Sequence, residues 1–332
     1  MRFFCTAVLW CLCAALPMAW WAPADAAPKR NLVLYSALTA TTPQMPLWGV
    51  IRNEGWPRGF TVRPEYWKNL DDLRGAMLAG KGDLWVGHLE GFAQAALRGA
   101  PVTLVAVTGW KKFHVIAPET SGVKTMEDLA SELRREGVPL AVTPQDSPAL
   151  GVLETIRERG GPSFAIAAMQ PQQLMLEMLR GSRRYALLPE PLVSAILAKK
   201  PKLRVLMGLE AEFARLYGGA ARLPFVGIAV NTRFAAKNAE LVRELVAAMQ
   251  RQDAYLAGDF GAALAVLPKE VREGLGDAVI RASLERDMIF TAPAAEVQDE
   301  IASFLRMVLP DAKTAPSAFA ALLEGPFLFR GK

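Results

Sequence analysis

Short apolar runs alternate with amphipathic stretches through much of the chain, and this alternation limits the folds that it can adopt. Asn31–Ser36, Leu84–Val86 and Val102–Val107 are apolar runs of strand length. Between them, Leu70–Leu78 reads as a helix with Leu70, Leu73 and Met77 on one face, and it ends at Gly80. Strands and helices in this order predict a doubly wound, largely parallel β-sheet covered by helices.

The same alternation starts again near residue 125. Thr125-Met126-Glu127-Asp128 has the form of a capping box, and Leu140–Thr143 has the pattern of a strand. Leu70–Gly87 and Leu174–Pro191 both run as a helix, a turn with glycine, a short buried strand and a loop. The sequence therefore predicts two α/β halves, and from residue 239 onward a mainly helical C-terminal part.

The first 26 residues have the layout of an export signal. Met1-Arg2 is followed by a mostly apolar run to about Ala22, and Ala24-x-Ala26 is the small-residue pattern that a signal peptidase recognises. An uncleaved membrane anchor is the alternative, because the apolar run is nearly long enough to cross a bilayer. Pro17 and Pro23 favour cleavage, so we expect the working protein to begin near Ala27, outside the cytoplasm.

The composition excludes several kinds of chemistry. All three cysteines precede residue 14, so the mature chain is expected to have neither a disulfide nor a thiolate. The net charge is only +5, and no basic block is interleaved with aromatic residues, so a nucleic-acid partner is not expected. His88 and His114 are the only histidines and lie far apart, so we expect neither a metal nor a cofactor, although a metal site made of oxygen ligands alone stays open.

Four motifs resemble those of one family of proteins. They are Leu78–Gly87 (LAGKGDLWVG), Gly99–Val102 (GAPV), Leu187–Pro191 (LLPEP), and Pro224–Phe234 (PFVGIAVNTRF) with residues 238–242 after it. In order and spacing they are similar to segments of the substrate-binding proteins of ABC transporters in the nitrate, sulfonate and taurine class, which also holds thiamine-pyrimidine binders. The resemblance covers about residues 31–305.

The resemblance implies a type II periplasmic-binding-protein fold. Two α/β lobes, each a doubly wound mixed sheet, would be joined by two crossovers near Ala117–Lys124 and Ala220–Phe225. One lobe would comprise residues 31–117 plus 225–332, and the other residues 118–224. It also implies a periplasmic monomer that closes on a small-molecule ligand and delivers it to a permease and an ATPase in the inner membrane.

Polar and aromatic residues follow the expected strand ends, where ligands bind in doubly wound sheets. The loop 37–44 offers hydroxyl and N–H groups, although threonines in such loops also cap helices. Trp110 would wall the pocket, whereas Trp67 could equally be core, His88 structural and Ser147 an ordinary cap. The candidate ligand-binding residues are Thr39, Thr41, Thr42, Gln44, Trp67, His88, Glu90, Trp110, Gln145, Asp146, Ser147 and Glu190.

These residues leave two ligand classes open. Threonine-rich loops and helix N-termini favour an oxyanion, whereas Trp67 and Trp110 together with Glu90 and Glu190 favour a flat or cationic organic molecule. Carboxylates that face the cleft would repel a sulfonate unless an arginine paired with them, and the candidate loops contain no arginine. The sequence therefore favours a small organic molecule.

Two other functions fit the same fold. Relatives that make the thiamine pyrimidine are enzymes, but they carry a cysteine-rich motif that this chain lacks. The chain also has neither a G-x-S-x-G motif nor a phosphate-binding P-loop, so we expect no enzymatic activity. The second alternative is a protein that senses a ligand for a membrane receptor without transporting it.

Overall fold

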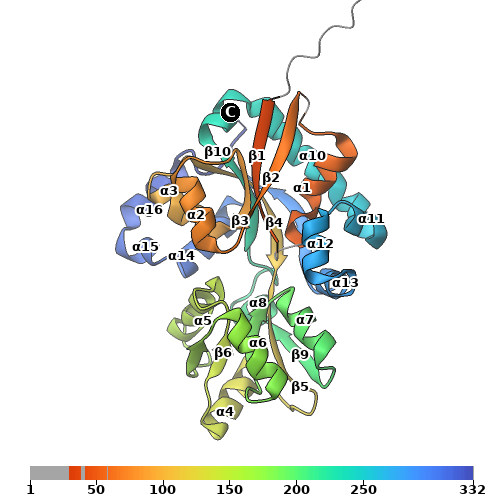
Figure 1. Ribbon diagram of the computed structural model, residues 1–332. Coiled ribbons are helices and arrows are strands. Elements are labelled where there is room, and N and C mark those ends of the chain that lie inside the picture. Colours follow the sequence, from red (N-terminus) through yellow and green to blue (C-terminus); the bar gives the residue numbers. More distant parts are fainter. Residues whose placement is uncertain (1–29, 39–41, 58, 332) are drawn as a thin grey trace, which may run out of the picture.

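Two separate mixed β-sheets organise the chain, one in each lobe (Figure 1). The computed structural model describes residues 30–38, 42–57 and 59–331. The sheet of the first lobe has six strands in the order β11-β4-β10-β3-β1-β2. These strands are β1 Arg30–Ala37, β2 Phe60–Trp67, β3 Leu84–His88, β4 Val102–Lys111, β10 Val226–Asn231 and β11 Met288–Pro293.

The sheet of the second lobe has five strands in the order β7-β6-β8-β5-β9. They are β5 Phe113–Pro118, β6 Leu140–Val142, β7 Ile166–Ala168, β8 Ala186–Pro189 and β9 Leu203–Gly208. β5 pairs with β8 and β9 although the expected division at residue 117 assigns most of it to the first lobe. Only residue 112 separates β4 from β5, so the chain changes sheets at that residue.

Both sheets mix strand directions, and the predicted two-lobed fold is confirmed. β1 runs parallel to β2 and β3, as the alternation predicts. β10 returns antiparallel to β3 and β4, and β5 is antiparallel to both of its neighbours. The chain crosses between the lobes twice, once from β4 to β5 and once between β9 and β10.

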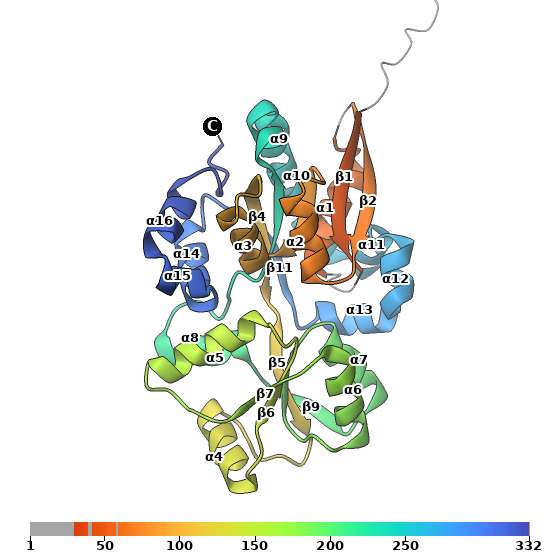
Figure 2. The same ribbon diagram turned by 60° about the vertical axis from the view of Figure 1, so that its left-hand side comes forward.

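Helices cover both faces of the first sheet (Figures 1 and 2). Helices α2, α3 and α14–α16 lie on one face, and α1 with α10–α13 lies on the other. The helices of this lobe are α1 Met45–Gly49, α2 Leu70–Leu78, α3 Leu89–Leu97, α9 Thr232–Lys237, α10 Ala239–Gly258, α11 Phe260–Ala265, α12 Lys269–Leu275, α13 Asp277–Leu284, α14 Gln298–Val308, α15 Pro310–Thr314 and α16 Pro316–Glu324. A 3-10 helix at Thr42–Gln44 and a π-helix at Val50–Glu54 flank α1.

The second lobe contains the helices α4 Met126–Glu136, α5 Pro148–Glu158, α6 Pro171–Arg180, α7 Leu192–Lys199 and α8 Leu209–Tyr217. Local sequence explains their ends. The predicted capping box is present, because the Thr125 hydroxyl accepts from the N–H of Asp128 and the Asp128 carboxylate accepts from the N–H of Thr125. Gly137 then ends α4 in the left-handed conformation that glycine favours.

One hydrophobic core runs through the junction of the lobes. The Phe113 and Phe225 rings lie 4.9 Å apart, and Phe225 meets Phe304 at 5.1 Å. A smaller apolar cluster covers the other face of the second sheet, under α6 and α7. The two lobes therefore share buried apolar surface on one side of the junction.

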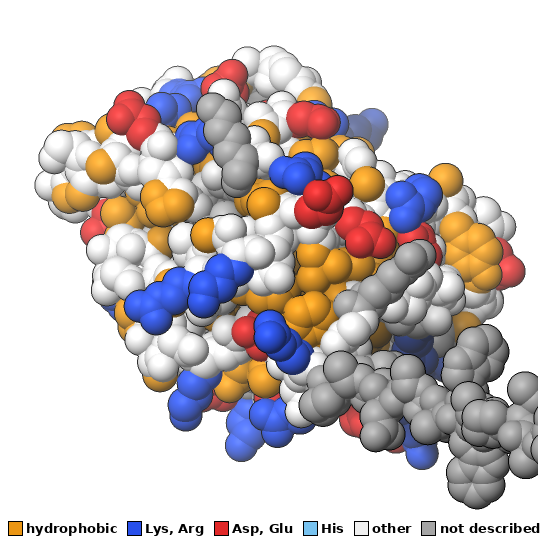
Figure 3. Space-filling model, turned by 90° about the horizontal axis from the view of Figure 1, so that it is seen from above, with side chains coloured by type: hydrophobic (Ala, Val, Ile, Leu, Met, Phe, Trp, Pro, Cys, Tyr) orange, Lys and Arg blue, Asp and Glu red, His pale blue; other side chains and the backbone are white. Residues whose placement is uncertain are grey.

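The expected signal, residues 1–26, lies outside the described residues. Among the helices in the described ranges, none has both the length and the apolar character needed to cross a membrane. Seen from the first-lobe end, basic and acidic side chains are interspersed on the surface (Figure 3). This mixture agrees with the small net charge of +5.

Candidate functional site

The junction of the lobes brings together the carboxyl ends of strands from both sheets. β4 points the same way as β1, β2 and β3, because β10 is antiparallel to both β3 and β4. β4 runs directly into the second lobe, so the ends of all four strands face that lobe. β6 and β8 end at the junction too, because β8 is antiparallel to β5, which starts there. Ligands of doubly wound sheets bind beyond such strand ends.

Backbone hydrogen bonds join the two segments that cross between the lobes. The N–H of Leu223 donates to the carbonyl of Trp110 at 2.8 Å, and the N–H of Phe225 donates to that of Gly109 at 3.0 Å. One oxygen of Glu210 accepts from the N–H groups of Lys112 at 2.6 Å and of Phe113 at 3.0 Å. Glu210 therefore holds the first crossing in place.

Burial changes the pKa values of two side chains beside this crossing, Glu210 and His114. It raises the pKa of Glu210 to about 7, although the two donated N–H groups act in the opposite direction. His114, on β5, is also buried, and its burial together with the nearby charges of Lys111 and Arg286 lowers its pKa to about 3. The imidazole is therefore neutral near pH 7.

The two candidate tryptophans lie at strand ends but are buried. Trp110 has no exposed surface. Its ring stacks on Phe290 with centroids 4.9 Å apart, and its N–H donates to the carbonyl of Phe290 at 2.9 Å. Trp67 donates its N–H to the carbonyl of Val86 at 3.1 Å. Both indole N–H groups are thus used inside the first lobe, and a ligand role for either ring stays a prediction.

Of the candidates in the loop after β1, Thr39 and Thr41 lie outside the described residues. Thr42 donates its hydroxyl to the carboxylate of Asp287. The side chain of Gln44 donates to the carbonyl of Ala37 at 2.9 Å and accepts from the N–H of Trp48 at 3.1 Å. These bonds hold the turn before α1, and a ligand role for Thr42 or Gln44 stays a prediction.

His88 and Glu90 stand together where β3 ends and α3 begins. Nδ1 of His88 lies 3.2 Å from Oε1 of Glu90. Glu90 is buried, and its second oxygen has no hydrogen-bond partner. Oε2 of Glu90 can therefore accept a hydrogen bond from a ligand at the junction.

In the second lobe the residues after β6 divide into caps and junction groups. Ser147 caps α5, because its hydroxyl accepts from the N–H of Ala149 at 3.2 Å. Gln145 is exposed and accepts from the side chain of Gln170 at 3.2 Å. Asp146 reaches across the junction, where its Oδ2 lies 3.7 Å from Nη2 of Arg74. Asp146 therefore links the lobes.

Glu190 also links the lobes, through a fully buried carboxylate. It accepts from the N–H of Ser194 at 3.1 Å and from the Ser194 hydroxyl at 3.0 Å. Arg286 of the first lobe approaches Glu190 to 3.4 Å and donates to the Ser194 hydroxyl at 2.9 Å. Burial and the nearby charge of Asp287 raise the pKa of Glu190.

The sequence-based prediction missed four charged residues at the junction. Arg74 lies on α2, whose sequence reads as an ordinary amphipathic helix. Lys112 and Asp287 form a buried pair with Nζ and Oδ2 3.3 Å apart. Lys112 follows a strand end and could have been found by that rule, whereas Asp287 and Arg286 precede a strand that carried no motif.

Hydrogen-bonding capacity is left over at this junction. Buried polar atoms of proteins nearly always have partners. Within the described residues, the buried side-chain atoms that lack one all belong to residues at or beside the junction. They are Nε of Arg74, Oε2 of Glu90, Oγ1 of Thr108, Nε2 of His114, Oγ1 of Thr143, Oε2 of Glu210 and Oδ1 of Asp287. The junction thus combines donors, acceptors and charges of both signs.

In the same described part of the chain, no group of three or more His, Cys, Asp or Glu side chains is placed to hold a metal ion.

Comparison with known proteins shows the fold and not a sequence family. No protein-family profile and no curated protein matches the chain. An ABC transporter structure from Parabacteroides distasonis matches with a TM-score of 0.68 at 14% identity, over 90% of this chain and 98% of the other. The periplasmic aliphatic sulphonate-binding protein SsuA of Escherichia coli matches with 0.65 at 17% identity, over 91% of each chain. The periplasmic nitrate-binding protein NrtA of Synechocystis PCC 6803 matches with 0.63 at 11% identity, over 90% and 86%. The chain therefore shares the fold of periplasmic binding proteins of ABC transporters, as its motifs predict.

Proposed function

We propose that this protein is the solute-binding component of an ABC importer and captures a small organic molecule between its two lobes. The observation that carries the proposal is the gathering of unpartnered buried polar atoms at a junction that two crossings span. A binding protein needs such atoms for its ligand and needs no reacting group. The names of the matched sulphonate- and nitrate-binding proteins support the same role.

The charges at the junction favour an organic ligand over an inorganic oxyanion. Arg74 offers the N–H of its Nε to an acceptor group, while its Nη1 and Nη2 lie 2.8 Å from Asp71 and 3.7 Å from Asp146. Glu90 keeps a carboxylate oxygen without a partner in the same lobe, and Thr143 offers a hydroxyl from the other lobe. A simple anion would satisfy Arg74 but be repelled by Glu90. A molecule that carries both an acceptor and a donor would satisfy all three.

The membership of the strands in the two sheets supports revised bounds for the lobes. We propose that the first lobe comprises residues 31–111 and 225–332, and that residues 113–217 form the second. Residue 112 and the segment 218–224 would be the hinges. The protein would work as a periplasmic monomer, after cleavage of its signal, beside a permease and an ATPase.

The test begins with the mature protein purified under native conditions. Mass spectrometry of the extracted small molecules and a thermal-shift screen of sulfonates, nitrate, bicarbonate and pyrimidines would identify the ligand. A ligand that binds only the folded state raises the melting temperature. Arg74→Ala and Glu90→Gln should weaken that shift.

Arg63→Ala is the matched control for Arg74→Ala, because Arg63 is an exposed arginine of the same lobe paired with Glu65. It should leave the shift unchanged. Equal shifts in all three variants and the wild type would show that the ligand binds elsewhere. Turnover of any compound by the purified protein would contradict the binding role.

A further inference from the structure

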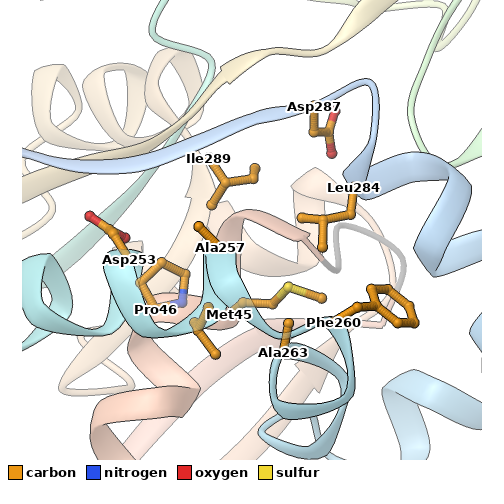
Figure 4. Close-up of a pocket in the computed structure, with 10 residues that line it drawn as sticks. Met45, Pro46, Asp253, Ala257, Phe260, Ala263, Leu284, Asp287 and Ile289 are labelled. Carbon is orange, nitrogen blue, oxygen red and sulfur yellow. The ribbon is translucent and has the colours of Figure 1, made fainter.

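A cavity of about 280 Å³ lies within the helix layer of the first lobe, between α1, α10, α11, α13 and β11 (Figure 4). Its apolar wall includes Met45, Leu256, Phe260, Leu284 and Ile289. This helix layer and α2 cover opposite faces of the first sheet (Figure 1). The cavity is therefore separate from the surroundings of Arg74, although its residue Asp287 also belongs to the junction.

Two carboxylates interrupt this apolar wall. Asp253 and Asp287 both line the cavity and come from different segments, α10 and the turn between α13 and β11 (Figure 4). Asp253 accepts from the N–H of Thr291 at 2.6 Å and from the Thr291 hydroxyl at 3.0 Å. These bonds hold the Asp253 carboxylate in a fixed position beside the cavity.

Asp287 has capacity to bind one more group. Its side chain has no exposed surface. Oδ2 accepts from the hydroxyl of Thr42, from Nζ of Lys112 at 3.3 Å and from the hydroxyl of Ser283 at 3.4 Å. Oδ1 has no partner at all. A buried carboxylate oxygen without a donor is unfavourable, and a donor that enters the cavity would relieve it.

The charges around the cavity favour a cation. Two carboxyl groups line it and only Asp287 has a cationic partner, Lys112, while burial raises the pKa of both carboxyl groups. Arg281 lies over the Phe260 ring at 3.6 Å, but it is exposed and its charge is screened by water. An apolar cavity of about 150 Å³ holds benzene. A cavity of 280 Å³ has room for an aromatic ring with a short side chain.

We propose that this cavity is a second binding site, which takes a small organic ammonium ion with an apolar body, and that Oδ1 of Asp287 receives the ammonium group. The site is coupled to the junction of the lobes by covalent and hydrogen bonds. Asp287 holds Thr42 and Lys112, and the preceding Arg286 contacts Glu190 of the second lobe. An occupant of the cavity would therefore influence the closure of the lobes.

The experiment uses 2-phenylethylammonium chloride as the probe and 2-phenylethanol as its neutral counterpart. Both are titrated into the mature protein by isothermal calorimetry and by thermal shift. Ala257→Trp places a large ring beside the cavity, because Ala257 lines it and is exposed. Ala254→Trp is the control, an exposed alanine on the same helix that does not line the cavity. Asp287→Asn removes the receiving charge.

The ammonium probe should bind the wild type with saturation and bind Ala257→Trp at least about tenfold more weakly, a loss of 1.4 kcal/mol or more. Ala254→Trp should bind within about twofold of the wild type, and the alcohol should bind far more weakly than the ammonium. Arg74→Ala, which disables the candidate ligand site, should leave this binding unchanged.

Three results with the wild type and Ala257→Trp would overturn the proposal. They are no saturable binding to the wild type, equal binding of the alcohol and the ammonium, and equal binding to Ala257→Trp and the wild type. If Asp287→Asn does not fold, the two tryptophan variants alone decide the outcome. Loss of probe binding in Arg74→Ala would place the probe in the candidate ligand site instead and would also refute a separate cavity site.

Discussion

The two sides of the lobe junction are built from different interactions. On one side α5 packs against α14 so closely that a Cβ added to Gly151 would lie 2.6 Å from the carbonyl oxygen of Met307. On the other side α7 faces α13, and Arg286 meets the buried Glu190 and Ser194 there. We refer to these as the packed side, α5 with α14, and the charged side, α7 with α13.

This difference indicates how the lobes separate. Opening the packed side would expose apolar surface, at a cost of roughly 25 cal/mol for each Å². Opening the charged side lets water replace each lost partner of Arg286 and Glu190, which offsets much of the cost. We therefore expect the lobes to pivot about the packed side and to open at the charged side.

The largest effect is expected from breaking the buried pair beside the charged side. In Lys112→Met, Asp287 keeps its place without a cation, and truncating one partner of a buried pair typically costs about 3–5 kcal/mol. Urea unfolding at pH 7 measures the loss. The double variant Lys112→Met/Asp287→Asn should recover most of it, because no unpaired charge remains. A single variant as stable as the wild type would show that the pair contributes nothing.

Glu210, which binds the first crossing at Lys112 and Phe113, should make the free energy of unfolding depend on pH. Burial raises the pKa of Glu210 from 4.5 to about 7, so in this window the folded protein holds a proton that the unfolded chain releases. The contribution of Glu210 to the free energy of unfolding therefore falls as the pH rises from about 4.5 to 7. The fall amounts to roughly 3 kcal/mol, at about 1.4 kcal/mol for each pKa unit.

Glu210→Gln isolates this contribution. His114 acts in the opposite direction below its ordinary pKa, because its folded pKa is lowered to about 3. Subtracting the stability curve of Glu210→Gln from that of the wild type cancels His114. A difference that stays constant between pH 4.5 and 7 would contradict the assignment of Glu210.

The packed side should not tolerate a single added methyl group. In Gly151→Ala the new Cβ would meet the backbone of Met307 and Val308, which cannot move aside cheaply. Overpacking of this kind costs about 1–3 kcal/mol. Gly75→Ala, also within a helix but with open space around it, should instead gain up to about 1 kcal/mol from helix propensity. The free energy of unfolding of each variant is compared with that of the wild type. Changes of the same sign in the two variants would contradict close packing at Gly151.

The smallest effects compare one ion pair on each side. Arg286→Ala should cost about 1–2 kcal/mol, because Glu190 is fully buried and loses a charged partner. Lys313→Ala removes an exposed pair with Glu158, on the packed side, and should change stability by less than about 0.5 kcal/mol. Thermal unfolding at low and high salt measures both. Equal losses would mean that the two sides do not differ in their electrostatics.

Most of the fold could be predicted from the sequence, because its signals are local. The capping box at Thr125 and the glycine at 137 set the ends of α4 through their own side chain and backbone. The residue at which the chain changes sheets could not be predicted in this way. Nothing local marks residue 112 as the change of sheets, since Val102–Lys111 and Phe113–Pro118 are both apolar strands.

The candidate site was harder to predict, because distant segments complete it. Trp110 is expected as a wall, but Phe290 of β11 stacks on it with an interplanar angle of 2° and buries it. Asp287 comes to Lys112 from 175 positions away in the chain. Such pairs depend on how β11 pairs with β4, which no pattern within either strand indicates.

The most direct test of the central claim is the distance between the lobes with and without ligand. No cysteine follows residue 13, so cysteines for spin labels can be introduced at chosen positions. One pair, at the exposed Lys199 and Glu270, reports on the charged side, and another, at Arg157 and Ser317, reports on the packed side. Protein stripped of small molecules by unfolding and refolding is compared with the same protein after the molecule recovered from the native preparation is returned. We expect double electron–electron resonance to show a longer Lys199–Glu270 distance in the stripped protein and little change between Arg157 and Ser317. Identical distances in the two samples would contradict closure of the lobes on a ligand.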